Sequence, residues 1–328
     1  MSKSLKFPEI NCRHFSPSVD RKSLFSGRMR FHQSWYRHHR LEMPPGPNPA
    51  AKGAIYGNLL TLEDGYQGEN FLTPEIFQQA QRRFPFPRKR QKSVRLYHNL
   101  LGSQTMCFNL FGPLIDQEIA TPLLRLLPGF PQAVIVTRIK IEYAPQKEDH
   151  LNDLTSFDAF IEYQYPDGNL GFIGIETKLS EPFSQKKYSF NKRYNRWMTK
   201  GNWWWKPGAE KNFSDKSFNQ LWRNQLLAYA MLHQENPRYQ EGFCAVVYPS
   251  GDTACGEAIT EYRQNLLTAG EQTLLVWPLE LIAESWSAFL EEYPSLSVWF
   301  EDFQTRYLNL ERSEDAWLKF KGANYGEN

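Results

Sequence analysis

Two acidic side chains and one lysine are spaced along the chain so that they could act together. Asp158 lies in an apolar-rich segment at 157–165, and Glu176 and Lys178 lie in a second one at 170–179. Two carboxylates that face each other repel, and a divalent cation held between them removes that penalty because it prefers carboxylate oxygen ligands. Two acids, an ammonium group and a cation form the smallest set that can cleave a phosphodiester bond.

The residues between the two segments predict a hairpin that brings these groups together. Pro166–Gly168 fits a tight loop, because Pro fixes φ and Gly accepts the left-handed conformation. If Tyr165 pairs with Asn169, the register places Asp158 opposite Glu176. Side chains alternate along a strand, so we expect the lysine to share their face.

The alternative is an edge hairpin that carries ordinary solvated charges. The neighbouring residues argue against it, because strands buried on both faces make an uncompensated charge costly. The apolar neighbours are Phe157, Phe160, Ile161, Phe172, Ile173 and Ile175.

A second polar pattern lies in a predicted apolar helix that begins near Phe218 and ends near Pro237. Gln225 and Tyr229 are four residues apart and therefore lie on one stripe of that helix. Their side chains are either surface or capping groups, or they reach into a neighbouring site. Their position about fifty residues after the Glu-x-Lys segment favours the second reading.

Together these motifs resemble the PD-(D/E)XK nuclease superfamily. The resemblance rests on Asp158, on Glu176-Thr177-Lys178 and on the Gln225–Tyr229 stretch, and the last is similar to the branch with RecB-like and Cas4-like nucleases. Residues 103–113 are similar to bacterial restriction-endonuclease-like proteins. The resemblance covers roughly residues 96–281.

Two features depart from the family pattern. Phe157, and not Pro, precedes Asp158. Cas4-like enzymes carry a four-cysteine iron–sulfur cluster, and the cysteines of this chain lack the spacing for such a site. They are Cys12, Cys107, Cys244 and Cys255.

The resemblance implies roles for the site residues. Asp158 and Glu176 would bind Mg²⁺, with Mn²⁺ as a possible substitute, and the carbonyl of Thr177 would be a further ligand. Lys178 would orient or help deprotonate the attacking water and stabilise phosphate charge.

Further site residues are expected from other elements. Gln225 and Tyr229 would position the substrate strand or the water. An additional metal carboxylate is expected from an earlier element, with Glu142 as the first choice and Glu118 as the second.

Positive charge is local, since the net charge of the 328 residues is only +2. The runs 82–95 and 186–206 contain no acidic residue, and the second interleaves cations with aromatic rings. Cations attract phosphates and aromatic rings stack on bases, so both runs could contact nucleic acid. The alternative for the first run is a solvated basic loop. The alternative for the second is a tryptophan cluster packed under its own loop. The candidate nucleic-acid contacts are Lys186, Lys187, Lys192, Arg193, Arg196 and Trp203.

We predict an α/β fold with a restriction-endonuclease-like core, in which helices flank a mixed central sheet. The expected division is a basic, partly irregular N-terminal extension at 1–92 and a nuclease domain with C-terminal helices at 93–328. No apolar run suggests a secretion signal or membrane span, so a cytoplasmic location is expected.

The predicted function is Mg²⁺-dependent cleavage of DNA, as a restriction-like endonuclease in bacterial defence. The alternatives are a RecB-like or Cas4-like exonuclease or end-processing subunit, an enzyme that processes RNA or damaged ends, and a DNA-binding module that acts with a partner ATPase. A homodimer is also possible.

Overall fold

The computed structural model divides the chain into two compact units. One contains Met1–Leu110 and Pro294–Asn328, and the other contains Phe111–Tyr293. This division differs from the predicted boundary at residue 92, because the C-terminal segment joins the N-terminal unit. The structure describes residues 24–48, 53–86, 94–115, 118–146, 150–152, 154–184, 192–213 and 219–325.

The first unit is mainly helical. Residues 24–39 form a 16-residue helix within the extension that we expected to be partly irregular. Two shorter helices follow at 94–98 and 103–111. The helices of this unit are α2 (Leu24–His39), α3 (Leu62–Gln67), α4 (Pro74–Arg83), α5 (Val94–His98), α6 (Ser103–Phe111), α14 (Pro294–Tyr307) and α15 (Glu314–Tyr325). The short strands β1 (Gly46–Pro47) and β2 (Ile55–Tyr56) pair antiparallel.

A buried arginine joins distant segments of the first unit. Arg306 on α14 donates from Nη1 to the Asn70 carbonyl at 2.7 Å, and from Nη2 to Asn70 Oδ1 at 2.5 Å. Its Nε donates to Gln33 Oε1 at 3.3 Å. In the same unit, Thr73 Oγ1 caps the start of α4 by accepting from Ile76 N.

The second unit is an α/β layer structure, as predicted. Its strands are β3 (Ile135–Tyr143), β4 (Phe157–Gln164), β5 (Leu170–Thr177), β6 (Glu241–Tyr248) and β7 (Leu274–Pro278). Its helices are α7 (Ala120–Arg125), α8 (Lys192–Lys200), α9 (Glu210–Phe213), α10 (Asn219–His233), α11 (Thr253–Arg263), α12 (Thr268–Gln272) and α13 (Leu279–Leu290).

The five strands form one mixed sheet in the order β3-β4-β5-β6-β7. The pairs β3–β4 and β4–β5 are antiparallel, and β5–β6 and β6–β7 are parallel. The β4–β5 hairpin has the predicted loop, because Tyr165 N donates to the Asn169 carbonyl at 2.9 Å and Gly168 has a φ of 90°. Ala159 pairs with Ile175, so the ladder follows the predicted register.

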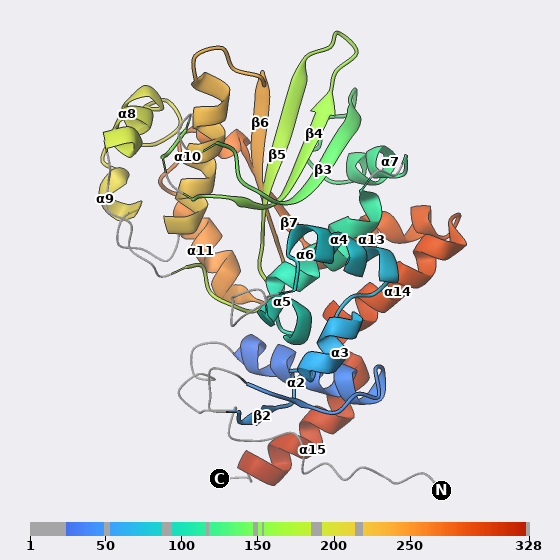
Figure 1. Ribbon diagram of the computed structural model, residues 1–328. Coiled ribbons are helices and arrows are strands. Elements are labelled where there is room, and N and C mark those ends of the chain that lie inside the picture. Colours follow the sequence, from blue (N-terminus) through green and yellow to red (C-terminus); the bar gives the residue numbers. More distant parts are fainter. Residues whose placement is uncertain are drawn as a thin grey trace, which may run out of the picture. The chain divides into compact units, whose positions relative to one another are not determined.

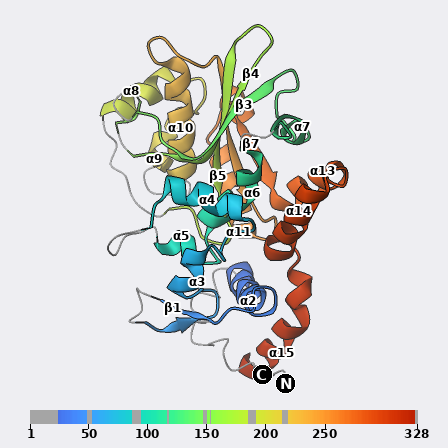
Figure 2. The same ribbon diagram turned by 45° about the vertical axis from the view of Figure 1, so that its right-hand side comes forward.

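Helices cover both faces of this sheet. In both views α8, α9 and α10 lie on one side and α7 on the other (Figures 1 and 2). Phe160 and Phe172 share one apolar cluster with Leu226 and other residues of α10. On the opposite face Phe130, after α7, packs against Tyr163 with ring centroids 5.9 Å apart.

No helix in the described part of the chain combines the length and apolar character that a membrane crossing would require.

Gly174 on β5 allows the ring of Phe157 to pack where the strands meet. A Cβ at this position would lie 2.4 Å from Cε1 of the buried Phe157. We therefore expect Gly174→Ala to lower the free energy of unfolding by about 1–3 kcal/mol, because the ring or the strand must shift. Urea unfolding followed by circular dichroism measures this change.

The matched control is Gly256→Ala on α11. A Cβ there meets no heavy atom closer than the Tyr248 hydroxyl oxygen at 3.3 Å, and Ala favours a helix over Gly by up to about 1 kcal/mol. Equal losses in the two variants would contradict the packing argument.

Candidate active site

The end of β5 lies between two neighbouring strands. Glu176 pairs with Val246 of β6, and Lys178 N donates to the Val247 carbonyl at 2.8 Å. The side chains of Glu176 and Lys178 are therefore almost fully buried, with 3% and 7% of their surfaces exposed. A buried carboxylate and a buried ammonium both need partners.

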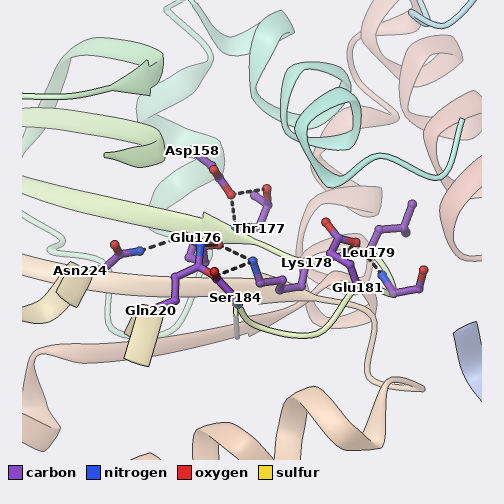
Figure 3. Close-up of polar contacts among 10 residues, drawn as sticks. Asp158, Glu176, Thr177, Lys178, Leu179, Glu181, Ser184, Gln220 and Asn224 are labelled. Carbon is purple, nitrogen blue, oxygen red and sulfur yellow. Dashed lines mark hydrogen bonds and ion pairs between the residues drawn. The ribbon is translucent and has the colours of Figure 1, made fainter. Parts of the chain in front are cut away.

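Three nitrogen donors surround the carboxylate of Glu176 (Figure 3). Lys178 Nζ lies 2.5 Å from Glu176 Oε1, and Gln220 Nε2 donates to the same oxygen at 2.5 Å. Asn224 Nδ2 donates to Oε2 at 2.9 Å. Both amides come from α10 and are four residues apart, so one helix stripe faces this acid.

The segment after β5 is tied to the same group. Gln220 Oε1 accepts from Lys178 Nζ at 3.2 Å and from Ser184 N at 3.1 Å. Glu181 Oε2 accepts from the backbone nitrogens of Leu179 and Ser180 at 3.2 and 3.1 Å. These bonds fix the backbone that follows Lys178.

Lys178 holds its proton firmly. Burial by itself would lower its pKa, but the negative charges of Glu176, Asp158 and Glu181 outweigh burial and raise the pKa above its ordinary value. The ammonium also lies 5.2 Å from the centre of the Phe183 ring. In this arrangement Lys178 is a fixed positive charge.

Asp158 has its own donors. Its Oδ2 accepts from Thr177 N at 2.8 Å and from Thr177 Oγ1 at 2.9 Å, and Figure 3 shows these contacts as a set separate from those of Glu176. Of the three predicted side chains, Glu176 and Lys178 form an ion pair, and Asp158 acts on Lys178 through its charge. The physical reason for the separate contacts is repulsion, because a half-buried and a buried carboxylate lower their energy when each faces its own donors.

Asp158 and Glu176 nevertheless interact electrostatically. Burial raises the pKa of Asp158, the negative charge of Glu176 raises it further, and the charge of Lys178 and the bonds from Thr177 oppose the rise. The site thus contains two acids close enough for the charge of Glu176 to disfavour ionisation of Asp158.

The predicted third carboxylate does not join them. Continuing the β3–β4 register places Glu142 opposite Asp158, but Glu142 has a φ of 57° and interrupts the regular strand. Glu118 is exposed in the turn before α7. Within the described ranges, no three His, Cys, Asp or Glu side chains gather as metal ligands.

Gln225 and Tyr229, which we predicted to reach this site, make hydrogen bonds to other parts of the second unit. Gln225 is fully buried, donates to the Gly270 carbonyl at 2.6 Å and to Thr273 Oγ1 at 2.8 Å, and accepts from the hydroxyl of Tyr262. The Tyr229 hydroxyl donates to the Lys200 carbonyl at 2.7 Å.

Sequence reasoning missed Gln220 and Asn224. They have the same four-residue spacing in the same helix as Gln225 and Tyr229, so the signal was present but did not distinguish the two stripes. Only the rotation of α10 against β5 shows which stripe faces Glu176.

The candidate nucleic-acid contacts differ in how far they are exposed to solvent. Lys192 and Arg196 are exposed on α8, and Trp203 has 46% of its surface exposed. Arg193 Nη1 instead donates to the His150 carbonyl at 3.4 Å. Trp204 and Trp205 are buried, as are Tyr194 and Trp197 of α8, so most of the aromatic run packs internally. Lys186 and Lys187 lie outside the described residues.

Comparison with known proteins identifies the class. Residues 18–309 match the family model of the PD-(D/E)XK nuclease superfamily, so the chain belongs to this superfamily. The mixed sheet flanked by helices is its restriction-endonuclease-like fold. No curated protein and no solved structure matches the chain.

The residues present fit a hard divalent cation, which this superfamily generally uses. Asp158 and Glu176 offer carboxylate oxygens. The negative charges of these two groups repel each other, and a divalent cation between them would offset that repulsion. Mg²⁺ is commonly held by one or two carboxylates and keeps several waters. Two acids are therefore a sufficient protein donor set.

The buried pair makes a prediction about stability. Lys178→Met should lower the free energy of unfolding by about 3–5 kcal/mol, because Glu176 would remain buried without its cation. The double variant Glu176→Gln/Lys178→Met should lose less than the sum of the single variants. Urea unfolding of the four proteins measures this coupling.

Arg196→Met is the matched control, since it removes an exposed cation of the same unit. It should change stability by less than about 0.5 kcal/mol. Additive losses for Glu176 and Lys178 would show that the pair is not coupled.

Proposed function

We propose that this protein hydrolyses DNA phosphodiester bonds with the help of a divalent cation. The carrying observation is the buried Glu176–Lys178 pair, 2.5 Å apart, next to Asp158 in a chain of the PD-(D/E)XK nuclease superfamily. This arrangement keeps acidic oxygens and an ammonium group in one place.

Asp158, Glu176 and the carbonyl of Thr177 would hold the cation, with Mg²⁺ as the first choice and Mn²⁺ as a substitute. Such a cation supplies Lewis-acid polarisation of a phosphate and acidifies a bound water. The hydrogen bonds from Thr177 already position Asp158, and those from Asn224 and Gln220 position Glu176.

Lys178 would act by its charge. Its raised pKa keeps it protonated while it is paired with Glu176, so it serves to stabilise phosphate charge and orient water and not as the base. Gln220, which contacts both Glu176 and Lys178, keeps the two at a fixed distance.

DNA is the proposed substrate, and an endonuclease is the preferred mode. The exposed cations Lys192, Arg196 and Lys200 lie on α8, which has no acidic residue. The exonuclease alternative rested on the Gln225–Tyr229 motif, whose side chains donate to the Gly270 and Lys200 carbonyls. A restriction-like role in defence remains part of the proposal.

The test is cleavage of closed circular, linear duplex and single-stranded DNA, and of RNA, with Mg²⁺, Mn²⁺ or EDTA. We expect circular DNA to be cut with either metal and not with EDTA. Glu176→Gln and Lys178→Ala should reduce the rate by about 10²–10³-fold, because each removes charge from the reacting group. Glu257→Gln, an exposed acid on α11, is the control.

A Lys178→Ala variant that folds and cuts as fast as the parent would remove its role. Cutting only at linear ends would favour the exonuclease, and cutting of RNA alone would overturn the choice of DNA. Binding without any cutting would favour a module that needs a partner ATPase.

A further inference from the structure

A cationic cavity lies in the second unit apart from Glu176. It has a volume of about 240 Å³ and lies between β3, the segment after it and the end of α10. The described residues that line it include no Asp or Glu, and its polar lining is Arg138, Lys140, Gln146, His150, Gln234 and Arg238.

A buried acid beneath the cavity orients both arginines. Glu162 Oε2 lies 2.7 Å from Arg138 Nη2 and 2.9 Å from Arg238 Nη2, and it also accepts from the Tyr239 hydroxyl at 2.7 Å. Only 6% of the Glu162 side chain is exposed, whereas Arg138 and Arg238 have 33% and 55% exposed. The acid therefore holds one nitrogen of each guanidinium group, while part of both arginine side chains stays exposed.

Lys140 adds a third cation. It follows Arg138 by two residues on β3 and so shares its face, and its exposed ammonium lies 5.8 Å from the centre of the Tyr143 ring. Among these described groups, Arg138, Lys140 and Arg238 carry three positive charges and Glu162 carries one negative charge. The group therefore has an excess of two positive charges. Fixed guanidinium forks match the geometry of a phosphate.

The distance from the candidate active site suits one nucleic-acid strand. Glu162 pairs with Phe172, which is four residues before Glu176 on β5. Four strand residues span about 13 Å, and this is the axial rise of about four nucleotides in one strand of a duplex. Glu162 and Glu176 both face α10, since Glu176 bonds Asn224 and Phe172 packs with that helix.

We propose that this cavity binds a backbone phosphate of the substrate strand, about four nucleotides from the bond that is cut. Arg138, Lys140 and Arg238 supply the charge, and the cavity is large enough for a phosphate with its sugar but too small for a base pair. The inference rests on the proposed function, because it assigns a second contact for the same substrate.

The experiment measures DNA binding separately from cutting. The affinity of the full chain for labelled duplex and single-stranded DNA is measured by fluorescence anisotropy in EDTA over a range of KCl concentrations. The variant is Lys140→Gln/Arg238→Gln, and the control is Arg312→Gln/Lys319→Gln, two exposed cations of the first unit that do not line the cavity. Inorganic phosphate is tested as a competitor.

We expect the cavity variant to bind about tenfold more weakly at low salt. The slope of log K against log salt should fall by about one, as for one lost phosphate contact. The control should change neither value. If the double variant does not fold, Lys140→Gln alone should give a smaller change in the same direction.

Unchanged affinity and slope in the folded variant would overturn the proposal, as would a parent chain that binds no DNA. A third outcome would also overturn the proposal: phosphate competes with DNA for the parent but not for the variant, and the variant binds DNA as tightly as the parent. The cavity would then bind free phosphate and not the DNA strand. Undiminished cutting by Glu176→Gln would overturn the proposed active site and does not bear on these binding measurements, so a failure of the active site and a failure of the cavity can be told apart.

Discussion

The charge pair between Glu176 and Lys178 is the constraint on which the site depends. A carboxylate and an ammonium buried to this degree cannot rely on water, so the surrounding chain must supply their partners. Strand β6 covers one side, and the amides of Gln220 and Asn224 complete the hydrogen bonds of the acid. The rotation of α10 about its axis is thereby linked to the chemistry at the end of β5.

The same constraint explains why Asp158 stands apart from Glu176. A second carboxylate beside a buried first one raises the energy of both, and Thr177 relieves this by donating from its nitrogen and its hydroxyl to Asp158. The hairpin therefore holds two acids near each other in a state of mutual repulsion. A divalent cation bound between them would turn this repulsion into attraction.

Two buried acids on one sheet face are satisfied in different ways. Glu176 is enclosed by one ammonium and two amides, whereas Glu162 is held by two guanidinium groups that reach the surface. The first arrangement holds an acid at a fixed distance from a buried ammonium group. In the second, the buried acid Glu162 holds two arginines whose side chains are partly exposed. This difference distinguishes the candidate active site from the cationic cavity.

The sequence alone determined the hairpin, the register and the family. Pro166–Gly168 fixes the turn, period-two alternation fixes which residues of β4 and β5 oppose each other, and these are local effects. The division of units could not be predicted, because the return of 294–328 to the N-terminal unit depends on contacts such as those of Arg306. The choice between two amide stripes of α10 also needed the tertiary structure. Both stripes satisfy helical spacing, and only packing against β5 and against Tyr262 decides which one faces Glu176.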